Sequence, residues 1–177
     1  MPVIVNKLTG ESVSEPVAIA EYLENIYPED TLRRNGTTIT YIDAIRKFSG
    51  FYPALYNCIT NKDPKKDGPL FKVVIDYIDT IDEMIRSTPG KFLCGIDFNM
   101  ADLYLTPLLW NAQVSLDIFK QYELMQFDID PERPALEKYM KYLFGMKEFN
   151  DKRVYIHVNK IVYGWKVYRN EAPPPFD

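Results

Sequence analysis

The side chains able to do thiol, acid–base or metal chemistry are few and scattered in this sequence of 177 residues. The two cysteines, Cys58 and Cys94, are far apart and form no Cys-x-x-Cys pair, so neither a redox dithiol nor a disulfide scaffold is indicated. A reactive thiol needs an electropositive setting, typically a helix N-terminus. Lys91 is the one cation near Cys94, and we interpret both cysteines as small buried apolar residues. The single histidine, His157, cannot build a multi-histidine site, so no metal is expected.

Composition and charge narrow the function classes. Hydrophobic residues make up 46% and charged residues 26%, an ordinary globular balance. A net charge of −4 disfavours binding to nucleic acid or to anionic lipid as the main role. No apolar run reaches the roughly 18–20 residues of a membrane helix, and no signal peptide is evident. We therefore expect a cytoplasmic chain without a stable membrane span.

One stretch carries the strongest helix-start signal. Gly95 permits a tight turn, and Asn99 then stands at an N-cap with Asp102 three residues later, the spacing of a capping box. This predicts a helix that begins at Met100. The helix has almost no polar face and should be buried on most sides, with a kink at Pro107. We interpret Asn99 and Asp102 as a structural capping box and not as catalytic residues.

The residues before that stretch predict a small β unit. Residues 2–5 and 12–14 favour two short strands, and the polar, glycine-containing turn between them favours a hairpin. Pro16 suits the first position of a helix, which Pro28 should end. The expected order is strand, hairpin, strand, helix.

The remainder of the chain favours helices. After a polar linker over 29–36, the spacing predicts one long helix over 39–59, bent at Pro53. Residues 61–68 read as a solvated charged loop, and Pro69 as the start of the next helix. Long helices joined by short polar turns are typical of antiparallel neighbours in a bundle.

The C-terminal part continues this pattern. Pro134 should begin another helix, with Gly145 as its C-terminal stop. Residues 154–167 are interpreted as a terminal helix, and the proline-rich end as a mobile tail.

Two segments resemble the glutathione transferase superfamily. Residues 1–28, with Met1-Pro-Val-Ile-Val and then Ser14-Glu-Pro-Val-Ala-Ile-Ala-Glu-Tyr-Leu-Glu, resemble the end of its thioredoxin-like domain, where a strand begins at a cis-proline. Residues 92–107 resemble the capping box before the core helix of its C-terminal domain. Later motifs such as Val162-Tyr-Gly-Trp165 resemble the dehydroascorbate reductase and chloride intracellular channel branch, near the omega class. The resemblance covers essentially the whole chain.

The resemblance implies a mainly α fold. An all-helical domain of the glutathione transferase C-terminal type would occupy 37–171. A strand–hairpin–helix remnant of a thioredoxin-like domain over 1–28 and the linker over 29–36 would precede it, and a flexible tail over 172–177 would follow.

The resemblance also implies a remnant of a glutathione site at Met1, Pro2, Glu15 and Pro16. The family usually has a serine at the position of Pro16, whose hydroxyl and backbone N–H hold the γ-glutamyl carboxylate. Proline has neither donor. The family's catalytic Cys, Ser or Tyr precedes the position of Met1, so no catalytic residue is carried over to this chain.

An acceptor-substrate pocket is the second implied site. In the family it lies between helices, where Tyr52, Tyr56, Tyr104 and Trp110 of this chain would line it. Aromatic residues at helical spacing are also ordinary core residues, and both interpretations stay open.

The resemblance leaves two alternative functions for this chain. The first is a glutathione-dependent transferase or thiol reductase whose catalytic half is not in this chain, which would be inactive alone. The second is a non-catalytic protein interaction module of the same fold. In either case we expect an apolar patch and an open sheet edge at residues 2–5, and hence self-association or a protein partner on that face.

Overall fold

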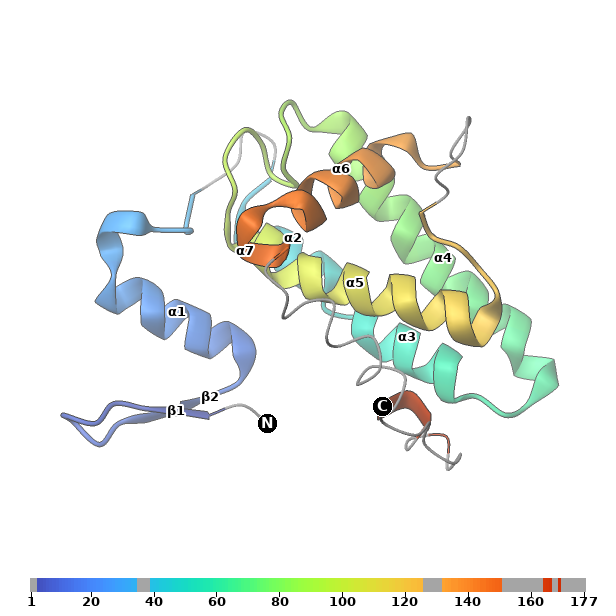
Figure 1. Ribbon diagram of the computed structural model, residues 1–177, viewed down its shortest axis with the longest axis horizontal. Helices are drawn as coiled ribbons and strands as arrows, with labels where there is room; N and C mark the ends of the chain where they lie inside the picture. Colours follow the sequence, from blue (N-terminus) through green and yellow to red (C-terminus); the bar gives the residue numbers. More distant parts are fainter. Residues whose placement is uncertain (1–2, 35–38, 126–131, 151–163, 167–168, 170–177) are drawn as a thin grey trace.

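The computed structural model describes residues 3–34, 39–125, 132–150, 164–166 and 169 (Figure 1). A β-hairpin and its following helix stand beside a bundle of helices, which confirms the predicted mainly α fold. No helix in the described ranges is both long and apolar enough to cross a membrane. The elements, in chain order, are β1 (Val3–Val5), β2 (Ser12–Ser14), α1 (Pro16–Ile26), the 3-10 helix η1 (Pro28–Asp30), α2 (Tyr41–Phe48), α3 (Phe51–Thr60), α4 (Pro64–Ser87), α5 (Met100–Lys120), α6 (Pro134–Gly145) and α7 (Lys147–Asn150).

The hairpin and α1 form the strand–hairpin–strand–helix unit that the sequence predicts. β1 and β2 pair antiparallel, with Ile4 opposite Val13. These two half-buried side chains share one face of the sheet, and the amide of Asn6 on the same face donates to the Tyr22 hydroxyl of α1 at 2.9 Å. The helix therefore covers one face of the hairpin.

The predicted long helix over 39–59 is wrong, because the structure has two helices, α2 and α3, which Ser49 and Gly50 separate. Pro53 has no N–H to donate to the carbonyl of Ser49, so the helical ladder is interrupted there. A Cβ on Gly50 would lie 2.2 Å from the Tyr77 hydroxyl of α4, so a side chain at this position would require the Tyr77 ring to shift.

The predicted loop over 61–68 is also wrong in most of its length, since α4 begins at Pro64 and not at Pro69. Asp63 is the N-cap, and its carboxylate accepts from the N–H of Lys65 at 3.0 Å. A capping aspartate followed by proline is the stronger start signal, because the first helical N–H needs no partner inside the helix.

The later helices follow the prediction more closely. α5 begins at Met100 and α6 at Pro134, as expected, and α6 ends at Gly145 itself. The helix predicted over 154–167 lies outside the described residues except for residues 164–166, which are helical. The predicted tail over 172–177 lies outside them entirely.

α5 is the centre of the bundle. It contacts α2, α3 and α6, while α4 packs on α3 and α6. Ten residues of α5 are buried, as expected for a helix with almost no polar face. The fully buried leucines Leu105, Leu109 and Leu116 lie along it.

The capping box at the start of α5 is confirmed, and it does more than cap. Asn99 accepts from the N–H of Ala101 at 2.8 Å. The buried Asp102 carboxylate accepts from the N–H of Asn99 at 2.9 Å, the N–H of Leu93 at 2.8 Å and the hydroxyl of Tyr139 at 2.7 Å. Burial raises the pKa of the Asp102 carboxyl, although these hydrogen bonds oppose the shift. One side chain thus joins α5, the loop before it and α6.

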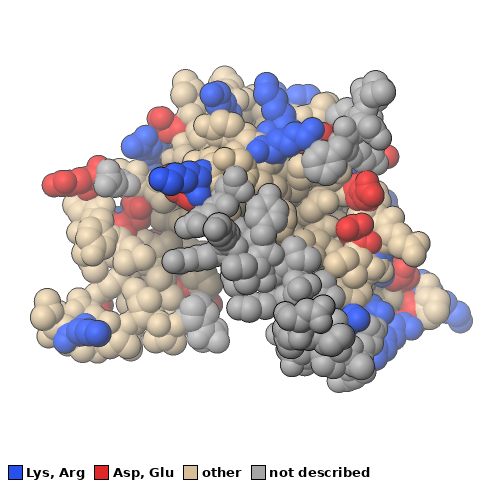
Figure 2. All heavy atoms as spheres, in the orientation of Figure 1, with Lys and Arg blue, Asp and Glu red and all other residues tan. Residues whose placement is uncertain are grey.

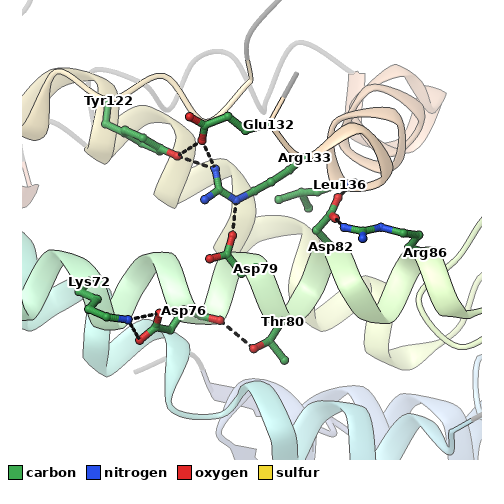
Figure 3. A network of polar contacts seen from close by, with 10 residues as sticks. All are labelled: Lys72, Asp76, Asp79, Thr80, Asp82, Arg86, Tyr122, Glu132, Arg133 and Leu136. Atoms are coloured by element: carbon green, nitrogen blue, oxygen red, sulfur yellow. Dashed lines mark hydrogen bonds and ion pairs between the residues drawn. The ribbon is translucent and has the colours of Figure 1, made fainter. Parts of the chain in front are cut away.

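A second polar network joins α4 to the start of α6 (Figure 3). The N-cap residue of α6, Arg133, makes no side-chain cap, and instead the buried Asp82 of α4 accepts from the N–H of Leu136 at 2.9 Å. Asp82 also pairs with Arg86. Arg133 donates to Asp79 at 2.6 Å and so fixes the same end of α6.

The segment after η1, residues 31–34, connects α1 to the helical bundle. The Glu24 carboxylate of α1 accepts from the hydroxyl of Thr31 at 2.6 Å and from the N–H of Leu32. Burial alone would raise the pKa of Glu24, but these hydrogen bonds and the nearby Arg33 lower it. The Leu32 carbonyl then accepts from the N–H of Met100 at 2.9 Å. The predicted polar linker is therefore docked onto the start of α5.

Candidate functional site

Two residues of the predicted glutathione-site remnant, Glu15 and Pro16, lie at the junction of β2 and α1. Met1 and Pro2 are outside the described residues. Glu15 is exposed and has φ 76° and ψ 129°, a region that residues with a side chain rarely occupy. Its carbonyl accepts the first helical N–H, from Ile19 at 2.9 Å, and Pro16 takes the first position of α1. Such backbone strain gathers at ligand sites and is a reason to consider this turn functional.

Two of the predicted pocket tyrosines share a partner. Tyr52 and Tyr56 lie one turn apart on α3, and both rings contact Trp165, with centroid distances of 6.3 and 5.9 Å. The Trp165 indole donates to the side-chain oxygen of Asn111 on α5 at 3.2 Å. These residues form an aromatic surface with a polar residue at its base.

The other two predicted residues lie on α5. The described ring contact of Trp110 is with Phe144 of α6, edge to face at 5.2 Å. Tyr104 is half-buried, and its burial raises the pKa of the phenol. Among the described residues, no hydrogen bond or ring contact is seen that joins either of them to Tyr52 or Tyr56, so the assignment of all four to one pocket stays a prediction.

Neither cysteine has the surroundings of a nucleophile. Both thiols are free and fully buried. Burial raises the pKa of Cys58, and it raises that of Cys94 to about 11, with the charge of Asp102 adding to the effect. Both are therefore thiols and not thiolates at neutral pH. His157 lies outside the described residues. Within those residues no group of three His, Cys, Asp or Glu side chains could hold a metal ion.

A hollow of about 630 Å³ opens at the C-terminal ends of α3 and α5. It mixes charged, polar and apolar residues, namely Asn61, Lys62, Asp63, Pro64, Asp67, Phe119, Lys120 and Arg169. Asp67 pairs with Lys120 across it, which lowers the pKa of Asp67. No residue pattern in the sequence predicts this hollow.

Some of the residues around the aromatic surface were missed. Trp165 and Asn111 were not among the predicted pocket residues, although an asparagine on an apolar helix is a signal that could have been used. The strain at Glu15 has no signature in the sequence.

No family model matches the chain. The glutathione S-transferase DHAR2 of Arabidopsis thaliana is 26% identical over 167 residues, which is 94% of this chain and 70% of that protein. A probable maleylacetoacetate isomerase of Caenorhabditis elegans is 28% identical over 123 residues, which is 62% of this chain and 55% of that protein.

In fold, the chain is similar to the crystal structure of the Chlamydomonas reinhardtii dehydroascorbate reductase. The TM-score is 0.74 at 21% identity, over 95% of this chain and 72% of that one. Sequence similarity and fold together relate the chain to the glutathione S-transferase superfamily.

Proposed function

We propose that this chain is a glutathione transferase-like protein that carries the helical, acceptor-side part of a glutathione-dependent transferase or thiol reductase, and that the 177 residues alone are inactive. The observation that carries the proposal is the state of its thiols. In a fold whose relatives include a dehydroascorbate reductase, the two cysteines are buried and protonated. The bundle would position an acceptor substrate, while the reactive group would come from elsewhere.

The glutathione site is proposed to be weak for a local reason. The strained turn at Glu15 leads directly into α1. The N-terminus of a helix favours the binding of a carboxylate. Pro16 stands at that start and supplies neither an N–H nor a hydroxyl. The two donors expected for the γ-glutamyl carboxylate are therefore missing from this position.

Replacing Pro16 by serine should restore both donors. We expect Pro16→Ser to bind glutathione at least about tenfold more tightly than the unchanged chain, because hydrogen bonds to a charged group contribute about 1.5–3 kcal/mol each. Titration calorimetry with millimolar glutathione measures the difference.

Pro64→Ser is the matched control, since Pro64 also occupies the first position of a helix, α4. It should leave glutathione binding unchanged. Tight, saturable binding by the unchanged chain would contradict the proposal, and so would an equal gain in both variants.

The second candidate function is a non-catalytic interaction module. One observation favours it: from Val3 to Glu29 no residue is buried, although α1 carries apolar side chains. A surface of this kind marks a partner site.

For the compartment we propose the cytoplasm, because both thiols are free. Some relatives, such as the chloroplastic DHAR3 of Arabidopsis thaliana, carry another location in their names.

A further inference from the structure

The β-hairpin and α1, residues 3–26, form a unit that touches the bundle at few points. α1 packs on β2 and η1 but makes no extensive contact with a helix of the bundle. Among the described residues of this hairpin unit, only Ala20 packs against the hydrophobic core of the bundle. Figure 1 shows the unit beside the bundle, and on the face seen in Figure 2 it carries few charged groups. Its placement therefore depends on a small number of contacts.

The connecting segment, residues 31–34, is fixed to the bundle on one side. The Leu32 carbonyl accepts from the N–H of Met100 at 2.9 Å, and the Leu32 side chain packs against the bundle core. Met100 is the first residue of α5, where N–H groups have no acceptor inside the helix. Arg34 adds an ion pair with Asp97 at 3.5 Å, which contributes little because both side chains are largely exposed. The connecting segment is thus anchored at the start of α5.

Glu24 attaches α1 to the other side of this segment. Its carboxylate accepts from the Thr31 hydroxyl at 2.6 Å. Both carboxylate oxygens also accept from the N–H of Leu32, at 3.0 and 2.8 Å. These bonds are partly buried, and hydrogen bonds to an ionised group are stronger than those between neutral groups. One side chain of α1 therefore holds the anchored segment.

A second attachment is weaker. Arg33 donates to the side-chain oxygen of Asn25 and to the carbonyl of Glu21, each at 2.8 Å. Both of these bonds are exposed, and polar interactions are weaker where water surrounds them. Among the described residues, no hydrogen bond or ion pair is seen that runs directly from residues 3–26 to residues 39–169. Glu24 is therefore the main polar link between the hairpin unit and the bundle.

The chain between α1 and the anchored segment has the features of a hinge. α1 ends at Ile26, and Tyr27 leaves the helical region with φ −120° and ψ 66°. η1 is a single turn of three residues. Residues 27–29 are all exposed, so no core packing holds them. A few residues at the end of an element are the usual place where a change of angle is absorbed.

We propose that Glu24 is the latch of a hinge at residues 27–30, and that this latch fixes one orientation of the hairpin unit against the bundle. When Glu24 releases Leu32, the connecting segment stays on α5 and the hairpin unit turns about the hinge. The unit carries the turn at Glu15, and the bundle carries the aromatic surface. The latch would then set the distance between the glutathione side and the acceptor side. This last consequence rests on the proposed function, whereas the latch itself does not.

Hydrogen exchange of single amides in the full chain tests the latch without glutathione. Glu24→Ala should lower the protection of the Leu32 N–H at least about tenfold, because the charged acceptor is lost. The Met100 N–H should keep its protection, since its acceptor belongs to the anchored segment. Glu21→Ala is the matched control, because Glu21 is exposed on the same helix and binds Arg33 through its carbonyl and not its carboxylate. It should leave both amides unchanged.

Distances between two spin labels report the orientation itself. Leu8→Cys in the hairpin turn and Lys72→Cys on α4 introduce labels at exposed positions, while the native Cys58 and Cys94 are fully buried and should stay unlabelled. Double electron–electron resonance should give one narrow distance distribution with Glu24 in place. The distribution should become broader when Glu24→Ala is added.

Thr31→Val keeps the test decisive if Glu24→Ala does not fold. It removes the hydroxyl that donates to Glu24 and leaves α1 unaltered. The Leu32 amide should lose protection and the label distances should broaden, both by less than in Glu24→Ala. Three results would overturn the proposal: an unchanged Leu32 amide, an equal loss of protection at Leu32 and Met100, or a distance distribution that stays equally narrow.

Discussion

Asp102→Ala should lower the free energy of unfolding by about 4 kcal/mol, since it leaves three buried donors without an acceptor at about 1–3 kcal/mol each. These donors are the N–H groups of Leu93 and Asn99 and the hydroxyl of Tyr139. They belong to the loop before α5, to its N-cap and to α6, so the loss affects three parts of the core at once. Urea unfolding followed by circular dichroism measures the change.

Asp43→Ala is the control, because Asp43 holds the same third helical position in α2. There Thr40 is the N-cap, and the Asp43 carboxylate accepts from its hydroxyl at 2.7 Å. The Asp43 side chain is 52% exposed, so its loss should cost about 1 kcal/mol or less. If both variants lost the same stability, Asp102 would be an ordinary helix cap and not the junction described above.

Gly90→Ala should destabilise the chain by about 2–5 kcal/mol, because strain and a backbone clash add together. Gly90 has φ 127°, and a Cβ there would lie 2.3 Å from the carbonyl oxygen of Gly95. That carbonyl already accepts from the N–H of Phe92 at 3.0 Å, so it cannot move aside freely. Thermal and urea unfolding measure the effect.

Gly68→Ala provides the contrast. Gly68 lies inside α4 with nothing within 4 Å of its added Cβ. This variant should gain about 0.5–1 kcal/mol, because alanine restricts the unfolded chain and favours a helix. A loss of stability at Gly68, or no loss at Gly90, would contradict the geometry of the turn between α4 and α5.

The sequence predicted those elements whose signals are local. The start of α5 depends on Gly95, Asn99 and Asp102, which lie within eight residues of one another, and the structure has it at Met100. The hairpin and α1 were predicted in the same way, from β-branched runs and from prolines that flank a helix.

The two errors in the helix boundaries have different causes, because one involves a distant residue and the other a local cap. At the break between α2 and α3, Gly50 lies against Tyr77 of α4, a contact that no periodicity reveals. The start of α4 was misplaced because Pro64 and Pro69 both suit a first helical position, and the cap at Asp63 decides between them.

The candidate site was predictable only in part. Tyr52 and Tyr56 were named from the family resemblance, and they lie one turn apart on α3. Their common partner, Trp165, lies more than a hundred residues further along the chain and reaches them only through the fold. The strain at Glu15 is a property of the backbone that no residue type indicates.

The most direct test of the account is turnover by the chain itself. Glutathione-dependent reduction of dehydroascorbate is measured with the full 177-residue chain at increasing protein concentration. Because both thiols are buried and protonated, we predict a rate no higher than that of the reaction without protein. A rate that rises in proportion to protein concentration, and that Cys58→Ser or Cys94→Ser abolishes, would contradict the proposal. The proposal is that this helical part positions an acceptor substrate but supplies no reactive group.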